Sequence, residues 1–114
     1  MENDMEFSNY QFRAGKTAKY PNNPTLGVIY TALGLASEAG EVAGKVKKMI
    51  RDDSMELTHD RKDQILDELG DVLWYCAMLA TELNASLGEV AIRNLRKLED
   101  RNNRGVIQGS GDKR

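Results

Sequence analysis

Apolar residues recur every three or four positions through two long stretches of the chain, and this spacing constrains the fold more than any other feature of the sequence. In the first stretch, residues 24–51, they occur at Val28, Ala32, Leu35, Ala39, Val42, Val46 and Met49. In the second, residues 58–84, they occur at Ile65, Leu69, Val72, Cys76, Ala80 and Leu83. A period of about 3.6 residues gathers such side chains on one face of an α-helix. Each stretch therefore predicts a long amphipathic helix with one face directed at a core.

Local signals indicate where helices begin. Both prolines of the chain, Pro21 and Pro24, fall in one polar segment, and proline suits the first turn of the helix that follows. Ser86 and Glu89 have the spacing of a capping box, in which the serine accepts a hydrogen bond from the Glu89 amide while the glutamate reaches back. This motif predicts a further helix that continues to about residue 103.

A shorter helix is predicted around residues 7–14, where aromatic and apolar residues have helical spacing. The last ten residues contain three glycines and show no periodicity, which is typical of a flexible segment. With 114 residues, the chain is long enough for one compact domain. We therefore expect an all-α, four-helix domain over residues 1–104, followed by a flexible tail or lid over residues 105–114.

Composition narrows the class of protein. The formal net charge is −2, so the chain lacks the excess of lysine and arginine that binding to nucleic-acid backbones requires. No run of about 20 apolar residues and no signal-like N-terminal segment occurs, so no membrane contact is expected. Cys76 is the only cysteine and has apolar neighbours, which predicts a buried free thiol. We expect a cytoplasmic protein.

Two pairs of acidic residues are the strongest indication of chemistry. Glu38 and Glu41 are three positions apart on the first long helix, and Glu68 and Asp71 are three apart on the second. Residues with this spacing project from one side of a helix. Both pairs lie beside the apolar stripe, so four carboxylates would converge where two antiparallel helices meet. Unit charges about 4 Å apart repel by about 4 kcal/mol at an effective dielectric of about 20, and a cation would reverse the sign.

The type of donor indicates which cation such a cluster would hold. Ligation by oxygen alone suits Mg²⁺, Mn²⁺ or Ca²⁺, whereas zinc and copper sites favour histidine or cysteine. Di-iron carboxylate bundles need a Glu-x-x-His motif on each of two helices, and His59 is the only histidine of this chain. Hard cations held by carboxylates complete their coordination with water and phosphate oxygens. The acids therefore favour Mg²⁺-dependent phosphoryl chemistry.

Spacing alone is equally compatible with solvated helix faces, on which the acids form ordinary surface pairs with Lys45, Lys47 and Lys48. Three glycines near the acids, Gly34, Gly40 and Gly70, favour a site instead. Glycine inside a helix costs about 1 kcal/mol relative to alanine. Their presence suggests that another helix or a ligand approaches closely there.

The last predicted helix carries a polar face of its own. Asn94, Lys97 and Arg101 lie at positions i, i+3 and i+7, and the two cations have the length and charge to reach phosphate oxygens. A solvated face is the commoner explanation of such a pattern. Opposite an acidic metal cluster, the same three residues would become candidates for substrate binding.

At these residues the chain resembles the MazG-like, all-α nucleotide pyrophosphohydrolases, a superfamily that includes dimeric dUTPases and dCTP pyrophosphatases. Three segments carry the resemblance: LGLASEAGEVA at 33–43, ILDELGDVLWY at 65–75 and NLRKLEDR at 94–101. The resemblance covers most of the chain. It implies a bundle that forms a homodimer or homotetramer and hydrolyses a nucleoside triphosphate to the monophosphate and pyrophosphate.

The resemblance also implies roles for individual residues. Glu38, Glu41, Glu68 and Asp71 would be the catalytic acids and would bind Mg²⁺, or Mn²⁺ in its place. The substrate-binding residues would be Asn94, Lys97 and Arg101, with the two cations on the triphosphate. Many members have a further acid directly before the first glutamate, where this chain has Ser37. The group that activates water is therefore open between the metal and Glu38.

Other functions remain compatible with the sequence. A non-catalytic helical interaction module would keep the acids only as surface charge, and a nucleotide sensor would bind its ligand without turnover. The preferred base and sugar are not determined by the sequence, because their recognition would depend on the positions of aromatic residues such as Tyr10, Phe12 and Tyr30.

Overall fold

The computed structural model describes residues 4–21 and 23–114. Within them the chain forms four α-helices and no strand, as the sequence predicts. The helices are α1 (Phe7–Gly15), α2 (Pro24–Asp52), α3 (His59–Glu82) and α4 (Leu87–Asn103). The all-α prediction is therefore confirmed, with helix ends within about two residues of those expected from the sequence.

Polar side chains cap the three longer helices. The Asn23 side chain accepts hydrogen bonds from the Thr25 and Leu26 amides, with Pro24 in the first turn of α2. Thr58 caps α3 in the same way. The Ser86 hydroxyl accepts from the Glu89 amide at 3.0 Å, which confirms the serine half of the predicted capping box. These bonds satisfy amides that have no partner inside the helix.

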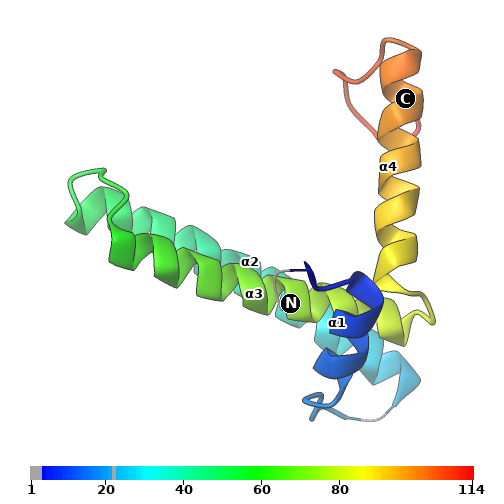
Figure 1. Cartoon of the computed structure of the whole chain (residues 1–114), viewed down its shortest axis with the longest axis horizontal. Helices are drawn as coiled ribbons and strands as arrows, with labels where there is room; N and C mark the ends of the chain where they lie inside the picture. Colours follow the sequence, from blue (N-terminus) through cyan, green and yellow to red (C-terminus); the bar gives the residue numbers. More distant parts are fainter. Residues whose placement is uncertain (1–3, 22) are drawn as a thin grey trace.

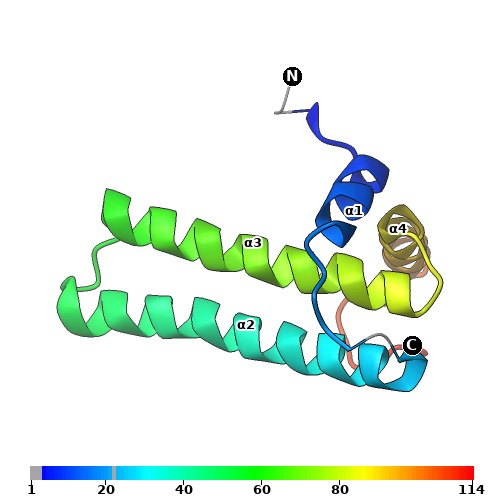
Figure 2. The same cartoon turned by 90° about the horizontal axis from the view of Figure 1, so that it is seen from below.

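Helices α2 and α3 form an antiparallel hairpin (Figure 2). Glycines let the two helices approach closely at two levels. A Cβ atom at Gly34 would overlap the ring of Tyr75, and one at Gly27 would overlap the carboxylate of Glu82. Gly34, singled out from the sequence, thus receives an aromatic ring from α3. These contacts fix which residues of the two helices face each other.

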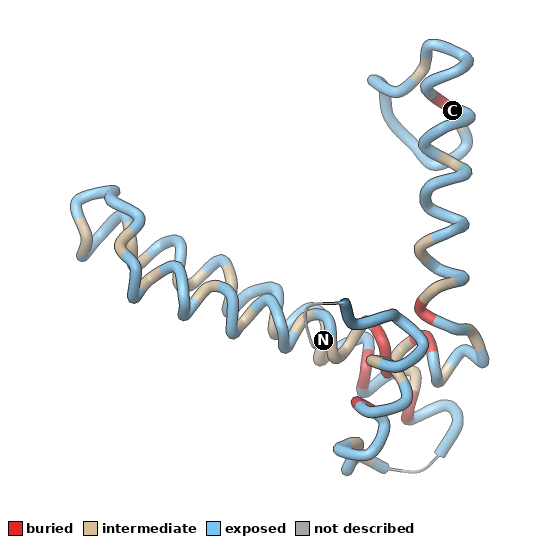
Figure 3. Tube along the Cα trace, viewed as in Figure 1, coloured by how far each residue is buried: buried red, intermediate tan, exposed pale blue. Residues whose placement is uncertain are grey.

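The buried core lies at one end of this hairpin. It consists of Ala14, Ala77, Met78 and Leu87, from α1, α3 and α4. Figure 3 shows most of the buried positions gathered where the helices meet, near the end of α3, and one further buried position, Arg101, at the far end of α4. The rest of the hairpin is only two helices thick. Its apolar stripes are therefore only partly covered within one chain.

The side chain of Gln11 holds the three helices together at this end. Its Nε2 donates to the Thr81 hydroxyl at 2.9 Å and to the Ala85 carbonyl at 3.1 Å. Its Oε1 accepts from the Leu87 amide at 2.8 Å, the first residue of α4. One amide group thus connects α1 to the end of α3 and the beginning of α4, and satisfies backbone groups that the corner between them would leave unpaired.

Helix α4 leaves the hairpin at this corner and projects away from it (Figure 1). It contacts α1 and α3 but not α2 in the part of the chain that the structure describes. The arrangement is open: the radius of gyration is 16.9 Å, against about 13 Å for a compact chain of this length. The four helices therefore do not close into a bundle within a single chain.

The hairpin contact predicts opposite effects of two glycine substitutions. Gly34→Ala should destabilise the protein by about 1 to 3 kcal/mol, because the added methyl group overlaps the Tyr75 ring. Gly44→Ala, on the same helix, places its Cβ in open space and should stabilise by up to about 1 kcal/mol through helix propensity. Urea denaturation measures both. Equal effects of the two substitutions would contradict the close approach of α2 and α3 at Gly34.

Candidate metal and phosphate site

Three of the four predicted acids converge across the hairpin. One carboxylate oxygen from each of Glu38, Glu68 and Asp71 lies within 4.8 Å of the others. The two helices run antiparallel, so the acids of α2 and α3 meet at the same level although 30 residues separate Glu38 from Glu68. This is the convergence that their spacing in the sequence predicts.

The fourth acid, Glu41, lies one turn farther along α2 and is exposed. It is outside the group of mutually close oxygens but still acts on it through charge. The pKa of Glu38 is raised by its partial removal from water, and then by the negative charges of Asp71, Glu68 and Glu41. Both causes disfavour the charged form of the Glu38 carboxylate in the absence of a cation.

These carboxylates fit a hard divalent cation. Ligand oxygens on opposite sides of one Mg²⁺ lie about 4 Å apart, because each Mg–O distance is about 2.1 Å. Oxygens that already lie within 4.8 Å of one another need only small side-chain rotations to reach that geometry. The donors are all oxygen, and neither a histidine nor a cysteine belongs to the cluster. This combination favours Mg²⁺ or Mn²⁺ over zinc or copper.

Aromatic side chains border the acidic cluster on the side of the core. Tyr30 stacks on Tyr20 with ring centroids 5.2 Å apart and lies 6.4 Å from Tyr75. Trp74 packs edge-on against Tyr75 and donates a hydrogen bond to Thr17. Burial raises the pKa of Tyr75, as do a hydrogen bond with Tyr30 and the nearby charges of Glu38 and Asp71. The acids therefore lie next to a largely aromatic surface.

The three aromatic residues considered for base recognition lie in different surroundings. Tyr30 belongs to the aromatic surface beside the acids and remains 44% exposed. Tyr10 packs against the core, and Phe12 lies on the exposed side of α1 under the ammonium group of Lys16. Of the three, Tyr30 combines exposure with a position beside the acids. Tyr75 was not singled out from the sequence, although its spacing of four from Asp71 places it on the same helix face.

The polar residues of α4 do not approach the acids within one chain. Lys97 lies ten residues into α4, and Asp71 lies eleven residues before the end of α3. At about 1.5 Å per residue, each is roughly 15 Å from the corner between the helices. Because α4 projects away from the hairpin (Figure 1), the two groups are separated. The acids and the cations are thus two distinct sites in a single chain.

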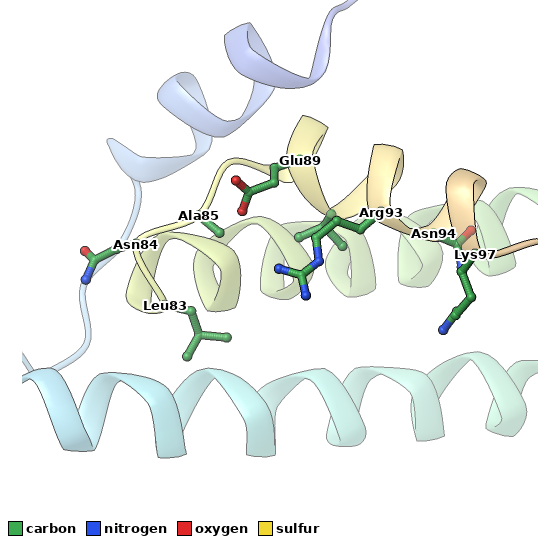
Figure 4. Close-up of a pocket in the computed structure, with 8 residues that line it drawn as sticks. Leu83, Asn84, Ala85, Glu89, Arg93, Asn94 and Lys97 are labelled. Carbon is green, nitrogen blue, oxygen red and sulfur yellow. The ribbon is translucent and has the colours of Figure 1, made fainter. Parts of the chain in front are cut away.

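Asn94 and Lys97 line a hollow of about 680 Å³ in the inner angle between α4 and the end of α3. Figure 4 shows their side chains along α4 together with Arg93 and Glu89, and Leu83 at the corner. Arg93 was not singled out from the sequence. Its position four residues before Lys97 is the signal that places both cations on one helix face.

Arg101 lies beyond this hollow and is almost fully buried, at 4% exposed. Its guanidinium group contacts the C-terminal segment rather than solvent. Nη2 donates to the backbone carbonyl of Asp112 at 2.6 Å and lies 3.4 Å from its carboxylate. Lys97 forms an ion pair with the same carboxylate at 3.2 Å. Both predicted phosphate-binding cations therefore share one anionic partner in this structure.

The structure also shows the surroundings of His59 and Cys76. His59 is exposed at the start of α3, as expected, and pairs with Asp63 one turn later. Cys76 is a free thiol that packs against the edge of the core but is only half-buried, because it also lines the open groove along α3. Its burial still raises its pKa. The sequence predicts a buried free thiol; the thiol is free, but its burial is only intermediate.

Comparisons with known proteins identify the family to which the chain belongs. The family model described as MazG nucleotide pyrophosphohydrolase domain matches residues 29–106. The Gene 37 protein of Mycobacterium phage L5 is 47% identical to this chain in an alignment that covers 96% of this chain and 100% of that protein. No solved structure gives a significant match. The chain belongs to the MazG nucleotide pyrophosphohydrolase domain family, and the resemblance seen in its motifs is confirmed.

The match includes all seven acids and polar residues singled out as candidates. In the described parts of the chain, no helix combines the length and the apolar character that crossing a membrane requires.

The convergence of the acids predicts that Glu68→Gln stabilises the metal-free protein, because it removes one like charge from the cluster. Wild-type protein at about 100 times the dissociation constant of Mg²⁺ should gain about 2.7 kcal/mol, or roughly ten degrees in melting temperature. The melting temperature of Glu68→Gln should be higher than that of the wild type without metal, and it should rise much less when Mg²⁺ is added. Thermal melting with chelator and with Mg²⁺ measures both effects.

Asp67→Asn is the matched control, because Asp67 is the exposed neighbour of Glu68 and is not part of the cluster. It should behave like the wild type in both conditions. A wild type whose melting temperature is indifferent to Mg²⁺ would exclude the shared metal site.

Proposed function

We propose that the chain is an Mg²⁺-dependent nucleoside triphosphate pyrophosphohydrolase that converts a nucleoside or deoxynucleoside triphosphate and water to the monophosphate and pyrophosphate. The observation that carries the proposal is the convergence of Glu38, Glu68 and Asp71 in a member of the MazG family. We expect the enzyme to act in the cytoplasm, where a reducing environment suits the free thiol of Cys76.

In this proposal Glu38, Glu41, Glu68 and Asp71 hold the cation, with Mn²⁺ able to replace Mg²⁺. When bound, the cation supplies polarisation of the phosphate oxygens and a lowered pKa of water. Burial and the three neighbouring charges raise the pKa of Glu38. The Glu38 side chain is therefore suited to accept a proton from the attacking water, where Ser37 offers no carboxylate.

Asn94, Lys97 and Arg101 bind the substrate in this proposal, with Lys97 and Arg101 on the phosphates. Their charges stabilise the leaving pyrophosphate, which carries the negative charge that develops as the bond to the α-phosphorus breaks. The aromatic surface formed by Tyr30 and Tyr75 adjoins the acids and offers flat apolar area to a sugar or base.

We further propose that the chain works as a homodimer or homotetramer. Its accessible surface is 8498 Å², against about 6300 Å² for a compact monomer of this mass. The excess of about 2200 Å² is what one subunit contributes to a large obligate interface. The apolar side chains available for such an interface are more than a third exposed: Leu33, Val46, Ile50, Leu66, Leu69, Leu73, Val90, Leu95 and Leu98.

Assembly also accounts for two features that one chain leaves unexplained. A Cβ at Gly40 or Gly70 would meet nothing within 4 Å, so these glycines beside the acids are available for close approach by another copy. The cations of α4 lie far from the acids of their own chain but on a helix that projects outward. A neighbouring copy would bring its own α4 to the acidic cluster, which completes the site.

Activity is tested by pyrophosphate release from a panel of ribo- and deoxynucleoside triphosphates with Mg²⁺. The wild type should turn over at least one of them, Glu68→Gln should be inactive, and Lys97→Ala should lower kcat/KM by about tenfold or more through loss of a charge-assisted contact. Circular dichroism should show unchanged helix content, because Lys97 is not part of the core.

Absence of turnover across the whole panel would support the alternatives, a non-catalytic interaction module or a nucleotide sensor. Saturable nucleotide binding without product would favour the sensor. If Lys97→Ala keeps the wild-type kcat/KM, Lys97 belongs to a solvated helix face and does not contact the substrate.

Assembly is tested by analytical ultracentrifugation of Leu69→Glu. Leu69 lies in an apolar groove of about 490 Å³ on the outer face of α3, together with Leu66, Leu73 and Gly70. A buried carboxylate there would disfavour association strongly, so the variant should sediment as a monomer or unfold. Leu57→Glu, in the loop between α2 and α3, should leave the oligomer intact. A monomeric wild type would contradict the proposal.

A further inference from the structure

The segment after α4 folds back on that helix. Residues 105–114, here called the C-terminal loop, begin at Gly105, whose φ of 74° lies in the left-handed region that glycine adopts at little cost. Gly109 and Gly111 also have positive φ. These three glycines reverse the chain direction, so that Asp112 returns to the level of Arg101 on α4.

Hydrogen bonds from arginine hold the loop closed. Arg114 donates to the backbone carbonyls of Val106, Ile107 and Gly111 at 2.7 to 3.1 Å. Arg104 donates to the backbone oxygen of Arg114 at 2.7 Å. Most of the loop is exposed, and Ile107 is 41% exposed. Polar contacts in water are individually weak, so this closure is suited to being opened by a competing ligand.

Asp112 is the only acid of the C-terminal loop, and its carboxylate lies between the two cations of α4. Oδ1 is 3.2 Å from Lys97 Nζ and 3.4 Å from Arg101 Nη2. Lys97 and then Arg101 hold the pKa of Asp112 below its usual range. The carboxylate itself is 83% exposed, whereas the Arg101 side chain is 5% exposed. The carboxylate is therefore paired with both cations, while it and the Lys97 side chain, which is 40% exposed, remain accessible to a competing anion from solvent.

We infer that the C-terminal loop is an autoinhibitory plug, in which Asp112 occupies the position of a substrate phosphate on Lys97 and Arg101. The inference rests on the proposed phosphate role of these two residues. A carboxylate carries one negative charge and a triphosphate carries three or four, so the polyphosphate makes the stronger contacts with the same cations. Binding of the triphosphate therefore requires release of the loop. Lys97 also lines the hollow that contains Arg93 and Asn94. The triphosphate therefore reaches Lys97 and Arg101 through this hollow.

The plug makes a prediction opposite to that of a lid. If the C-terminal loop were a lid that closes over bound ligand, removing the charge of Asp112 would weaken ligand binding. If the loop is a plug, the same change strengthens ligand binding. Inorganic tripolyphosphate is the probe, and its binding is measured by isothermal titration calorimetry on the full chain without divalent cations, so that no metal ion bridges the probe to the acidic cluster. Asp112→Asn should bind it about two- to fivefold more tightly than the wild type, the range expected from an exposed ion pair.

Glu99→Gln is the matched control, because it removes one negative charge from the same end of α4 and Glu99 forms no ion pair within residues 4–21 and 23–114. It should bind tripolyphosphate like the wild type. Lys97→Ala should weaken binding in the wild-type and Asp112→Asn backgrounds alike. Equal affinity of Asp112→Asn and the wild type, or weaker binding by the variant, would overturn the inference.

Nuclear magnetic resonance of the wild type provides a second, independent measurement. Addition of tripolyphosphate should move the amide chemical shifts of Gly109 and Gly111 towards random-coil values as the loop is released. Unchanged chemical shifts at saturation would contradict the plug. Failure of the proposed enzymatic activity is distinguishable, because it would appear as absent turnover with tripolyphosphate binding intact. No binding by any variant would refute the phosphate role of the cations and the plug with it.

Discussion

The close contact between α2 and α3 is the constraint on which the candidate metal site depends. Tyr75 lies against the backbone of α2 where Gly34 has no side chain, and this fixes the relative position of the two helices. Glu38 is one turn after Gly34, and Asp71 is one turn before Tyr75. Because the helices are antiparallel, both acids lie on the same side of this contact. A shift of either helix by one turn, about 5.4 Å, would separate the carboxylates.

The acidic cluster carries a cost in the absence of a cation, and the packing around it explains how the protein tolerates that cost. The core of Ala14, Ala77, Met78 and Leu87 lies at one end of the hairpin, and its α3 residues come about two turns after Asp71. Stability thus comes mainly from one place and the proposed chemistry from another. The aromatic residues Tyr30 and Tyr75 lie next to the acids, whose charges act on the Tyr75 hydroxyl.

The open arrangement of the chain links its stability to its proposed assembly. A single hairpin two helices thick leaves one face of each long helix in water, and α4 makes no contact with α2 that would cover it. The apolar groove around Leu69 and the glycines beside the acids lie on these uncovered surfaces. In the proposed oligomer the same surfaces would also shape the proposed active site, which would couple folding, assembly and substrate binding energetically.

Several features of the protein followed from the sequence alone. The 3.6-residue periodicity of apolar residues determined the two long helices, and Pro24 and the Ser86 cap indicated where two of the helices begin. Both are local properties, because they depend on residues within one or two turns. The spacing of the acids also predicted that they project from single faces. The motifs around them were specific enough to identify the MazG family.

Tertiary structure decided what no local pattern contains. The sequence placed Lys97 and Arg101 with the acids by resemblance, but the direction of α4 depends on the corner held by Gln11, whose partners lie at least 66 residues away. Periodicity predicted covered faces at Val46 and Leu69, yet it does not specify whether the covering helix belongs to the same chain. The pairing of Asp112 with both cations likewise arises only when the chain reverses at its glycines. Long-range contacts of this kind depend on the geometry of the whole chain, and sequence spacing therefore does not determine them.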